Sequence, residues 1–180
     1  LTSATVANYA VMNPLVSTDS SLTYASANLN VSGGGATLAT RCTMSTIAVT
    51  SGKWYAEVTV GTTNNGAYCG VVKPSNLGVS RDTCWNYYDG LIYPSGAGSF
   101  GTAVSGNVIG IAFDADNGTV QFYKNGSTNG AQQTGLTTGV EWAFYSEMGS
   151  GGQVQDWNFG QRPFTYTPPS GFVALNTYNL

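Results

Sequence analysis

The stretch VIGIAFDADNGTVQFYK, from Val108 to Lys124, contains two runs of β-favouring residues joined by a short polar segment. In the second run apolar residues alternate with polar or amphipathic ones, which is the period of two expected for a strand with one buried face. The joining segment contains Asn117-Gly118. This dipeptide favours a tight turn because both residue types tolerate a positive φ. The stretch therefore predicts an antiparallel β-hairpin.

The rest of the chain continues this β pattern. From Lys53 to Val60 every second side chain, beginning with Trp54, is apolar, whereas Lys53, Tyr55, Glu57 and Thr59 alternate with them. Long windows with helical periodicity are nearly absent, and Gly, Asn and Ser separate the short runs. This pattern indicates an all-β, two-sheet antiparallel β-sandwich. The predicted strands are Leu22–Tyr24, Asn28–Val31, Met44–Val49, Lys53–Val60, Ala67–Val72, Trp85–Tyr88, Leu91–Tyr93, Val108–Asp114, Thr119–Lys124, Trp142–Glu147 and Gln153–Asn158.

Composition limits the class of protein further. The chain has 180 residues, a suitable length for one domain, and only 8% of them are charged, well below the roughly 25% of typical soluble domains. Disorder does not explain this, because 12% of the residues are aromatic. The surface must instead consist largely of Ser, Thr, Asn, Gln and Gly. Extracellular and viral surface proteins have such compositions.

Several partners and chemistries are disfavoured. The six basic residues are spread along a chain of net charge −3, so there is no basic stripe for nucleic acid. No apolar run approaches the length needed for membrane insertion. There is no His, which removes the commonest general base and His-based metal sites. We therefore expect no enzyme activity, no cofactor and no metal, and a glycan-cleaving enzyme is only a remote alternative. The chain opening at Leu1 is expected to mark a piece of a longer protein.

Two apparent ligand motifs fail on inspection. Asp114–Gly118 begins like a calcium loop, but Gly118 takes the place of a ligand and Asn125 takes the place of the closing Glu. Gly96–Gly101 spells a phosphate-binding glycine pattern without the flanking strand and helix. A hairpin turn and a plain loop are the better interpretations.

The three cysteines, Cys42, Cys69 and Cys84, cannot all pair within one chain. Three buried thiols are favoured, and one disulfide with one free thiol remains the alternative.

The order of these motifs resembles the SPRY domain, the core of the B30.2 family. The residues that carry the resemblance are Ser51–Val58 (SGKWYAEV), Cys69–Val71, Trp85–Tyr88, the hairpin from Gly106 to Gly126, and Asn158–Gly160 (NFG). Trp85-Asn86 departs from the usual Trp-Gly of the family. The resemblance implies a jelly roll of the concanavalin and SPRY type. It gives one domain over residues 1–180, with a core at about 49–160 on which residues 1–20 and 161–180 pack.

The end of the chain resembles SPRY-containing proteins of bacteriophages and marine viruses. The residues are Asn158–Phe172 with Ala174–Thr177, and Tyr9–Leu15 resembles the opening of those domains. This resemblance implies a place on the virion surface, in a tail fibre or on the head, and adhesion to a host-surface glycan or protein. The alternative is structural decoration that contacts neighbouring virion subunits. Tail-fibre parents also suggest a homotrimer.

The SPRY resemblance also indicates the binding surface. It implies that the loops Gly33–Met44, Lys73–Cys84 and Glu147–Gly152 form that surface. Consecutive aromatics in the predicted strand Trp85–Tyr88 cannot all face one core, so some are expected to be exposed. Exposed Tyr and Trp suit partner contacts. The predicted contact residues are Arg41, Lys73, Asn76, Arg81, Trp85, Tyr87, Tyr93 and Met148.

Overall fold

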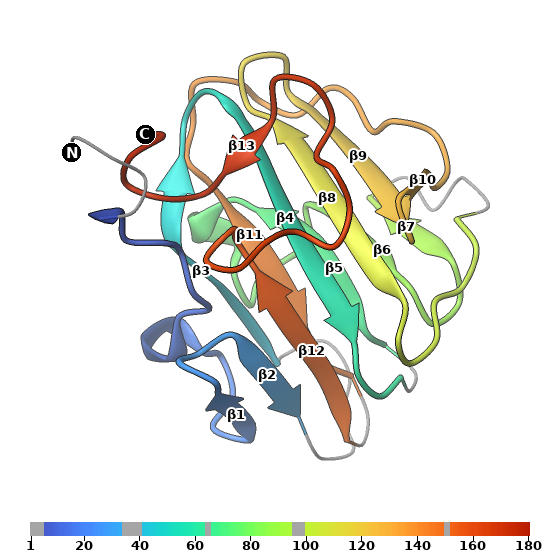
Figure 1. The fold of residues 1–180 in the computed structure, drawn as a ribbon. Helices are drawn as coiled ribbons and strands as arrows, with labels where there is room; N and C mark the ends of the chain where they lie inside the picture. Colours follow the sequence, from blue (N-terminus) through green and yellow to red (C-terminus); the bar gives the residue numbers. More distant parts are fainter. Residues whose placement is uncertain (1–5, 34–40, 64–65, 95–99, 150–151) are drawn as a thin grey trace.

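The computed structural model describes residues 6–33, 41–63, 66–94, 100–149 and 152–180, which form two β-sheets packed face to face (Figure 1). Two single turns of 3-10 helix, η2 (Pro14–Val16) and η3 (Pro74–Asn76), interrupt the strands. The strands are β1 (Leu22–Ala25), β2 (Asn30–Gly33), β3 (Cys42–Val49), β4 (Lys53–Val60), β5 (Tyr68–Val72), β6 (Thr83–Asn86), β7 (Leu91–Tyr93), β8 (Val108–Asp114), β9 (Thr119–Lys124), β10 (Ser127–Thr128), β11 (Trp142–Glu147), β12 (Gln153–Asn158) and β13 (Val173–Ala174).

Among the described residues, one sheet has the order β1-β2-β12-β4-β8-β9-β10, and β13 is its eighth strand. The other has the order β3-β11-β5-β6-β7. All pairs of neighbours are antiparallel except β13, which lies parallel to β4 at Trp54 and Tyr55. The predicted all-β, two-sheet antiparallel sandwich is thus confirmed.

The hydrophobic core lies between the two sheets. Alternation along β4 places Trp54, Ala56, Val58 and Val60 in this layer, as the period of two predicts. Aromatic side chains join the sheets: the ring centroids of Phe113 and Trp142 are 5.9 Å apart, and those of Trp85 and Phe122 are 6.2 Å apart. Such edge-on pairs add to the free energy gained by burying apolar surface.

The hairpin predicted from Val108 to Lys124 forms as β8 and β9, with Asp114 opposite Thr119. In the joining turn only Gly118 has a positive φ, and Asn117 donates from its backbone and side-chain nitrogens to the Asp114 carboxylate. The two-residue turn with positive φ at both positions is the next one, Asn125-Gly126, between β9 and β10.

Some strand boundaries differ from the prediction. The second strand is Asn30–Gly33 rather than Asn28–Val31, because Ser26, Ala27 and Asn28 have positive φ and form the preceding turn. The strand predicted at Trp85–Tyr88 is Thr83–Asn86, and the chain turns after Asn86. The first two strands and most of β3 precede residue 49, so the sheets extend beyond the 49–160 core.

The outer face of β4 is covered by the C-terminal segment, which crosses in front of β4 and β8 in Figure 1. Tyr55 and Glu57, which alternate with the core residues, are therefore buried as well. The Glu57 carboxylate accepts hydrogen bonds from the backbone N–H groups of Thr165 and Tyr166, both at 2.8 Å. The Phe164 ring packs edge-on against Tyr55 with centroids 5.0 Å apart.

Candidate functional site

Arg81 is the centre of a charged and aromatic cluster on the outer face of the five-stranded sheet. It lies in the loop between β5 and β6, and its Nε donates to Glu147 Oε2 at 2.6 Å while its Nη2 donates to Glu147 Oε1. The guanidinium carbon is 4.2 Å from the centroid of the Tyr68 ring and 5.1 Å from that of Tyr93. The fork of an arginine matches a carboxylate in this two-point geometry, and its planar face suits aromatic rings.

The register of the sheet explains why these side chains meet. Glu147 ends β11 directly opposite Tyr68 of β5. Tyr145 is two residues before Glu147, so it points to the same face and donates its hydroxyl to Glu147 Oε2 at 2.6 Å. On β7 the same alternation directs Leu91 and Tyr93 outward, while Ile92 enters the core.

Burial determines the electrostatics of this cluster. The Glu147 side chain is 1% exposed and that of Arg81 is 20% exposed. The hydrogen bonds to Glu147 raise the pKa of Arg81 above its usual value, and burial followed by the charge of Glu147 raises the pKa of Tyr145. The guanidinium therefore stays charged, and the tyrosine remains a neutral hydrogen-bond donor.

The loop that carries Arg81 is braced at its base by Asp82. The Asp82 carboxylate accepts from the backbone N–H of Lys73 at 2.8 Å and from the Asn76 side chain at 2.9 Å. It also forms an ion pair with Lys73 Nζ at 3.5 Å. At the loop tip Gly78 has a φ of +75°, and a Cβ there would lie 2.7 Å from Thr18 Cγ2. The contacts of Asp82 at the base of the loop and the close packing of Gly78 against Thr18 at its tip therefore fix the conformation of the loop.

The structure places two more of the predicted contact residues beside this cluster but buries both. Arg41 forms an ion pair with Asp19 at 3.2 Å and donates to the backbone oxygen of Gly149 at 2.9 Å. The backbone N–H of Met148 donates to the Arg41 carbonyl oxygen, and the Met148 side chain is in the core. Arg41 therefore holds the chain after β11 in place. Of the predicted loops, residues 34–40 and 150–151 lie outside the described residues.

Four of the predicted contact residues are buried and need correction: Arg41 is 5% exposed, and the other three are not exposed at all. Trp85, Tyr87 and Met148 have no exposed surface, so they cannot contact a ligand at the surface of this fold. Trp85 faces the layer between the sheets, and Tyr87 follows the end of β6, so strand alternation does not apply to it. The hydroxyl of Tyr87 accepts a hydrogen bond from Gln155 Nε2 at 3.0 Å, which satisfies its polar atom inside the core.

Two exposed apolar side chains near Arg81 were not predicted. Val79, two residues before Arg81, is 81% exposed, and Leu91, two residues before Tyr93, is 41% exposed. We use the name Arg81 surface for Val79, Arg81, Leu91 and Tyr93. The alternation of Leu91 and Tyr93 around the apolar Ile92 was the available signal in the sequence, since residues two apart share a face.

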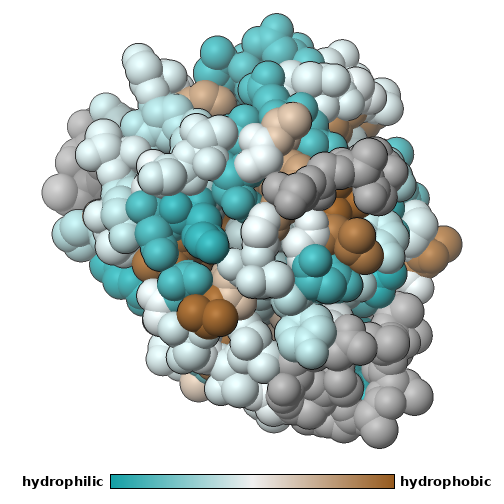
Figure 2. All heavy atoms as spheres, turned by 90° about the vertical axis from the view of Figure 1, so that its right-hand side faces the viewer, coloured by the Kyte–Doolittle hydropathy of each residue, from teal (hydrophilic) through white to brown (hydrophobic). Residues whose placement is uncertain are grey.

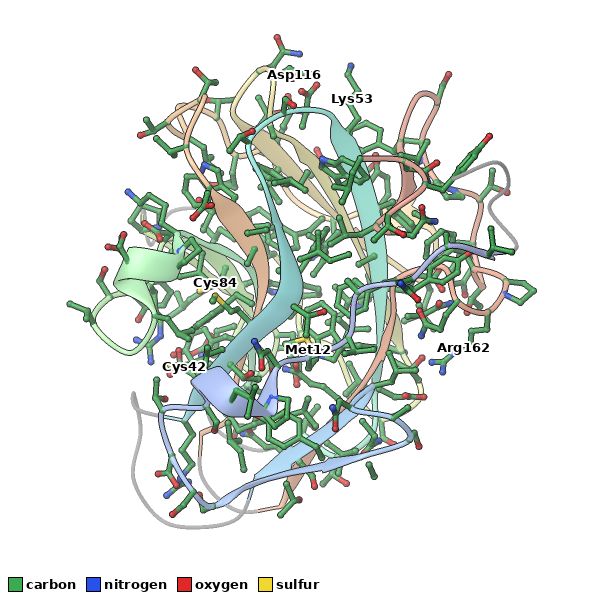
Figure 3. All side chains as sticks on the ribbon, turned by 90° about the vertical axis from the view of Figure 1, so that its left-hand side faces the viewer. Met12, Cys42, Lys53, Cys84, Asp116 and Arg162 are labelled. Carbon is green, nitrogen blue, oxygen red and sulfur yellow. The ribbon has the colours of Figure 1, made fainter. Side chains whose placement is uncertain are left out.

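The three cysteine side chains are almost inaccessible to solvent. Cys42, Cys69 and Cys84 are buried and unpaired, as the favoured interpretation predicted, and burial raises the pKa of each thiol. Figure 3 shows Cys84 beside the loop that carries η3. Across the part of the chain that the structure describes, no three His, Cys, Asp or Glu side chains come together to hold a metal ion. No helix within these residues is long and apolar enough to cross a membrane.

These features define an all-β sandwich with a braced loop over the outer face of its smaller sheet. The solved structure of the SPRY domain of human HERC1 has a similar fold, with a TM-score of 0.66. The match covers 84% of this chain and 99% of that one at 16% sequence identity, so it shows the fold alone. The predicted SPRY-like fold is thus confirmed. No family profile and no curated protein matches this chain.

Proposed function

We propose that this chain is a non-catalytic binding module that attaches to a protein partner through the Arg81 surface. The observation that carries the proposal is the fixed position of Arg81 between Tyr68, Tyr93 and Glu147. A side chain that is already ordered loses little conformational entropy when a partner binds. Arg and Tyr are also the residue types that contribute most to protein interfaces.

The composition of the Arg81 surface supports a protein partner in particular. Val79, two residues before Arg81 in the same loop, and Leu91, two residues before Tyr93 on β7, are exposed, and the counter-ion of Arg81 is the nearly inaccessible carboxylate of Glu147. A mixture of apolar side chains and one paired charge is typical of interfaces that form and separate, whereas permanent interfaces are more hydrophobic. On the face seen in Figure 2, hydrophobic residues form small separate areas between hydrophilic ones.

We further propose that the partner is a protein of the host-cell surface and that the module is displayed on a virion, in a tail fibre or on the head. The low charge of the chain and the resemblance of Asn158–Leu180 to phage proteins support this setting. A homotrimeric parent would present the Arg81 surface several times and so strengthen weak attachment.

The test compares three versions of the 180-residue chain on a panel of bacterial strains. Val79→Asp combined with Leu91→Asp places charge on the Arg81 surface, and Val104→Asp is the control, because Val104 is also exposed but lies outside that surface. We expect labelled wild-type chain to bind some strains, the double variant to lose at least about tenfold in affinity, and the control to bind normally. Protease treatment of the cells should abolish binding.

Two results would overturn this proposal. One is equal binding by the double variant and the wild type, with circular dichroism showing both folded. The other is a failure of the wild type to bind any strain while cross-linking of assembled particles joins the Arg81 surface to a neighbouring subunit. The second result would establish the structural, decorating role instead.

A further inference from the structure

Three hollows lie in a row along one end of the five-stranded sheet. They have volumes of about 200, 250 and 260 Å³. The first and second share Lys73, and the second and third share Glu141. Their linings follow the sheet order: Thr83 of β6 and Lys73 after β5 line the first, Lys73 and Glu141 line the second, and Val49 of β3 lines the third.

The spacing of strands sets the length of this row. Its linings run from β3 through β11 and β5 to β6, which are successive neighbours in the sheet. Neighbouring strands are about 4.8 Å apart, so the row is roughly 14 Å long. This length suits a linear chain of a few small units.

The walls of the first hollow are fixed by hydrogen bonds to the sandwich. Leu136, in the segment before β11, donates its backbone N–H to the Gly118 oxygen at 3.0 Å, and the Trp142 indole donates to the Thr137 oxygen at 2.9 Å. Lys73 Nζ lies 5.5 Å from the centroid of the Trp142 ring. The hollow therefore exists before any ligand arrives, as is usual for small-molecule sites.

The charges that line the row disfavour an ionic ligand. Lys73 is paired with Asp82, and Arg81, at the rim of the first hollow, is paired with Glu147. An anion would have to compete with these carboxylates, and at the other junction it would meet the exposed carboxylate of Glu141. A neutral ligand can form hydrogen bonds with these groups without separating the ion pairs.

We infer that this row binds a linear, uncharged oligosaccharide, with one sugar ring in each hollow. A cavity of about 150 Å³ accepts benzene, so hollows of about 200 to 260 Å³ have room for one substituted six-membered ring. Hydroxyl-bearing side chains line each hollow: Thr134 and Thr137 the first, Ser75 the second and Ser51 the third. Trp142 and Trp54 supply apolar wall in the first and third hollows.

An extended peptide fits these observations less well. Peptides that dock on sheets commonly add a strand at a sheet edge and use backbone hydrogen bonds. The row instead crosses the ends of four neighbouring strands. The site does not depend on the proposed attachment through the Arg81 surface, although Arg81 borders both.

The experiment measures binding of defined linear oligomers of β-1,4-glucan, α-1,4-glucan, xylan and chitin, from one to six residues long, by calorimetry. We expect at least one series to bind, with an affinity that rises up to three residues and then levels off. Because no net charge is involved, the affinity should change less than about twofold between 50 and 500 mM salt. An oligogalacturonate series should bind more weakly.

Two variants fill the row and one leaves it open. Thr134→Trp should block the first hollow and Ser75→Trp the second, each lowering the affinity for the trimer at least about tenfold, while Leu15→Trp, on η2, should leave it unchanged. The combination of Val79→Asp and Leu91→Asp should not alter sugar binding, which separates this site from the Arg81 surface.

Any of four outcomes would overturn the inference. These are no binding of any neutral series, equal affinity for one and three residues, tighter binding of the uronate series, and normal binding by both tryptophan variants. Displacement of the trimer by a library of extended peptides at lower concentration would assign the row to a protein ligand instead.

Discussion

The outer faces of the two sheets are covered in the same way but with different chemistry. On the eight-stranded sheet, the C-terminal segment is fastened to the buried carboxylate of Glu57 by two backbone N–H groups. On the five-stranded sheet, the loop between β5 and β6 is fastened to the buried carboxylate of Glu147 by the guanidinium of Arg81. Both carboxylates are almost inaccessible to solvent.

The two carboxylates differ in their donors: backbone N–H groups close the outer face of the eight-stranded sheet, whereas a charged guanidinium lies over the other sheet, at the proposed binding surface. Backbone N–H groups satisfy Glu57 inside the protein and leave nothing of the contact for a partner. Arg81 donates hydrogen bonds to the Glu147 carboxylate from the solvent side, and 20% of the Arg81 side chain stays exposed. The first arrangement closes its face, whereas the second presents a fixed, partly exposed cation beside the rings of Tyr68 and Tyr93.

The largest expected effect comes from breaking the charged fastening. Arg81→Ala leaves the Glu147 carboxylate buried without its cation, and removal of one partner from a buried pair costs about 3 to 5 kcal/mol. Urea unfolding at pH 7 should show this loss of stability. The control is Arg162→Ala, because the pair of Arg162 with Asp156 is 42% and 37% exposed and should contribute less than about 1 kcal/mol. Equal losses for the two variants would remove the distinction between the buried and exposed pairs.

Loss of the hydrogen bonds to Glu57 should lower the stability by less than loss of Arg81, and its effect should be confined to the C-terminal segment. Glu57→Ala leaves the amides of Thr165 and Tyr166 without their acceptor, at a cost of about 2 kcal/mol. In hydrogen exchange, those two amides should lose protection while the amides of β11 keep theirs. Glu57→Gln retains an acceptor oxygen and should recover part of the loss. Unchanged exchange at Thr165 and Tyr166 would show that Glu57 does not hold the C-terminal segment.

Neither fastening could be predicted from the sequence. The alternation along β4 correctly gives the side to which Glu57 points, but it does not say what covers that side, because the donors come from 108 and 109 residues away. Glu147 is likewise 66 residues from Arg81. Local patterns predict strand faces, whereas partners across such separations depend on the sheet order.

The candidate site was predicted in part for the same reason. Arg81 and Tyr93 were expected at the surface and are partly exposed there. Tyr87 was misplaced because the predicted strand ran two residues too far and the chain turns after Asn86. Trp85 lies in both the predicted and the observed strand, and it was misplaced because its side chain faces the core. The row of hollows was missed because it is lined by strand ends together with turns that lie far apart in the sequence, and no local period describes how these segments pack.

A third variant tests how tightly the C-terminal cover constrains the sheet beneath it. A Cβ at Gly110 of β8 would lie too close to the hydroxyl of Tyr55, which packs under the C-terminal segment. Gly110→Ala should therefore cost about 1 to 2 kcal/mol by overpacking, measured by thermal unfolding. Gly101→Ala is the control, because the nearest atom to its Cβ is 3.8 Å away. If Gly110→Ala left the thermal stability unchanged, Tyr55 and the C-terminal segment would be free to shift and make room for the methyl group.

The smallest expected effect comes from an ion pair at the margin of the C-terminal cover, between Lys53 and Asp114 at 3.1 Å. Figure 3 shows Lys53 near Asp116 at one end of the molecule, and its Nζ is 5.9 Å from the centroid of the Phe172 ring. The Lys53 side chain is 41% exposed, whereas that of Asp114 is 8% exposed. Lys53→Met should thus cost only about 0.2 to 1 kcal/mol at pH 7.

Acid should remove this small contribution. Burial alone would raise the pKa of Asp114. The hydrogen bonds from Asn117 and the contact with Lys53 together lower it by more than burial raises it, so the net pKa lies below its ordinary value. A lowered pKa stabilises the fold above the unfolded value of about 3.9, and this stabilisation is lost as the pH falls through the folded pKa. Urea midpoints of the wild type and Lys53→Met should therefore converge as the pH is lowered. If Lys53→Met lost as much stability at pH 7 as Arg81→Ala, burial of the cation would not explain the difference between the Lys53–Asp114 and Arg81–Glu147 pairs. The contrast between the C-terminal segment and the Arg81 loop would then need another cause.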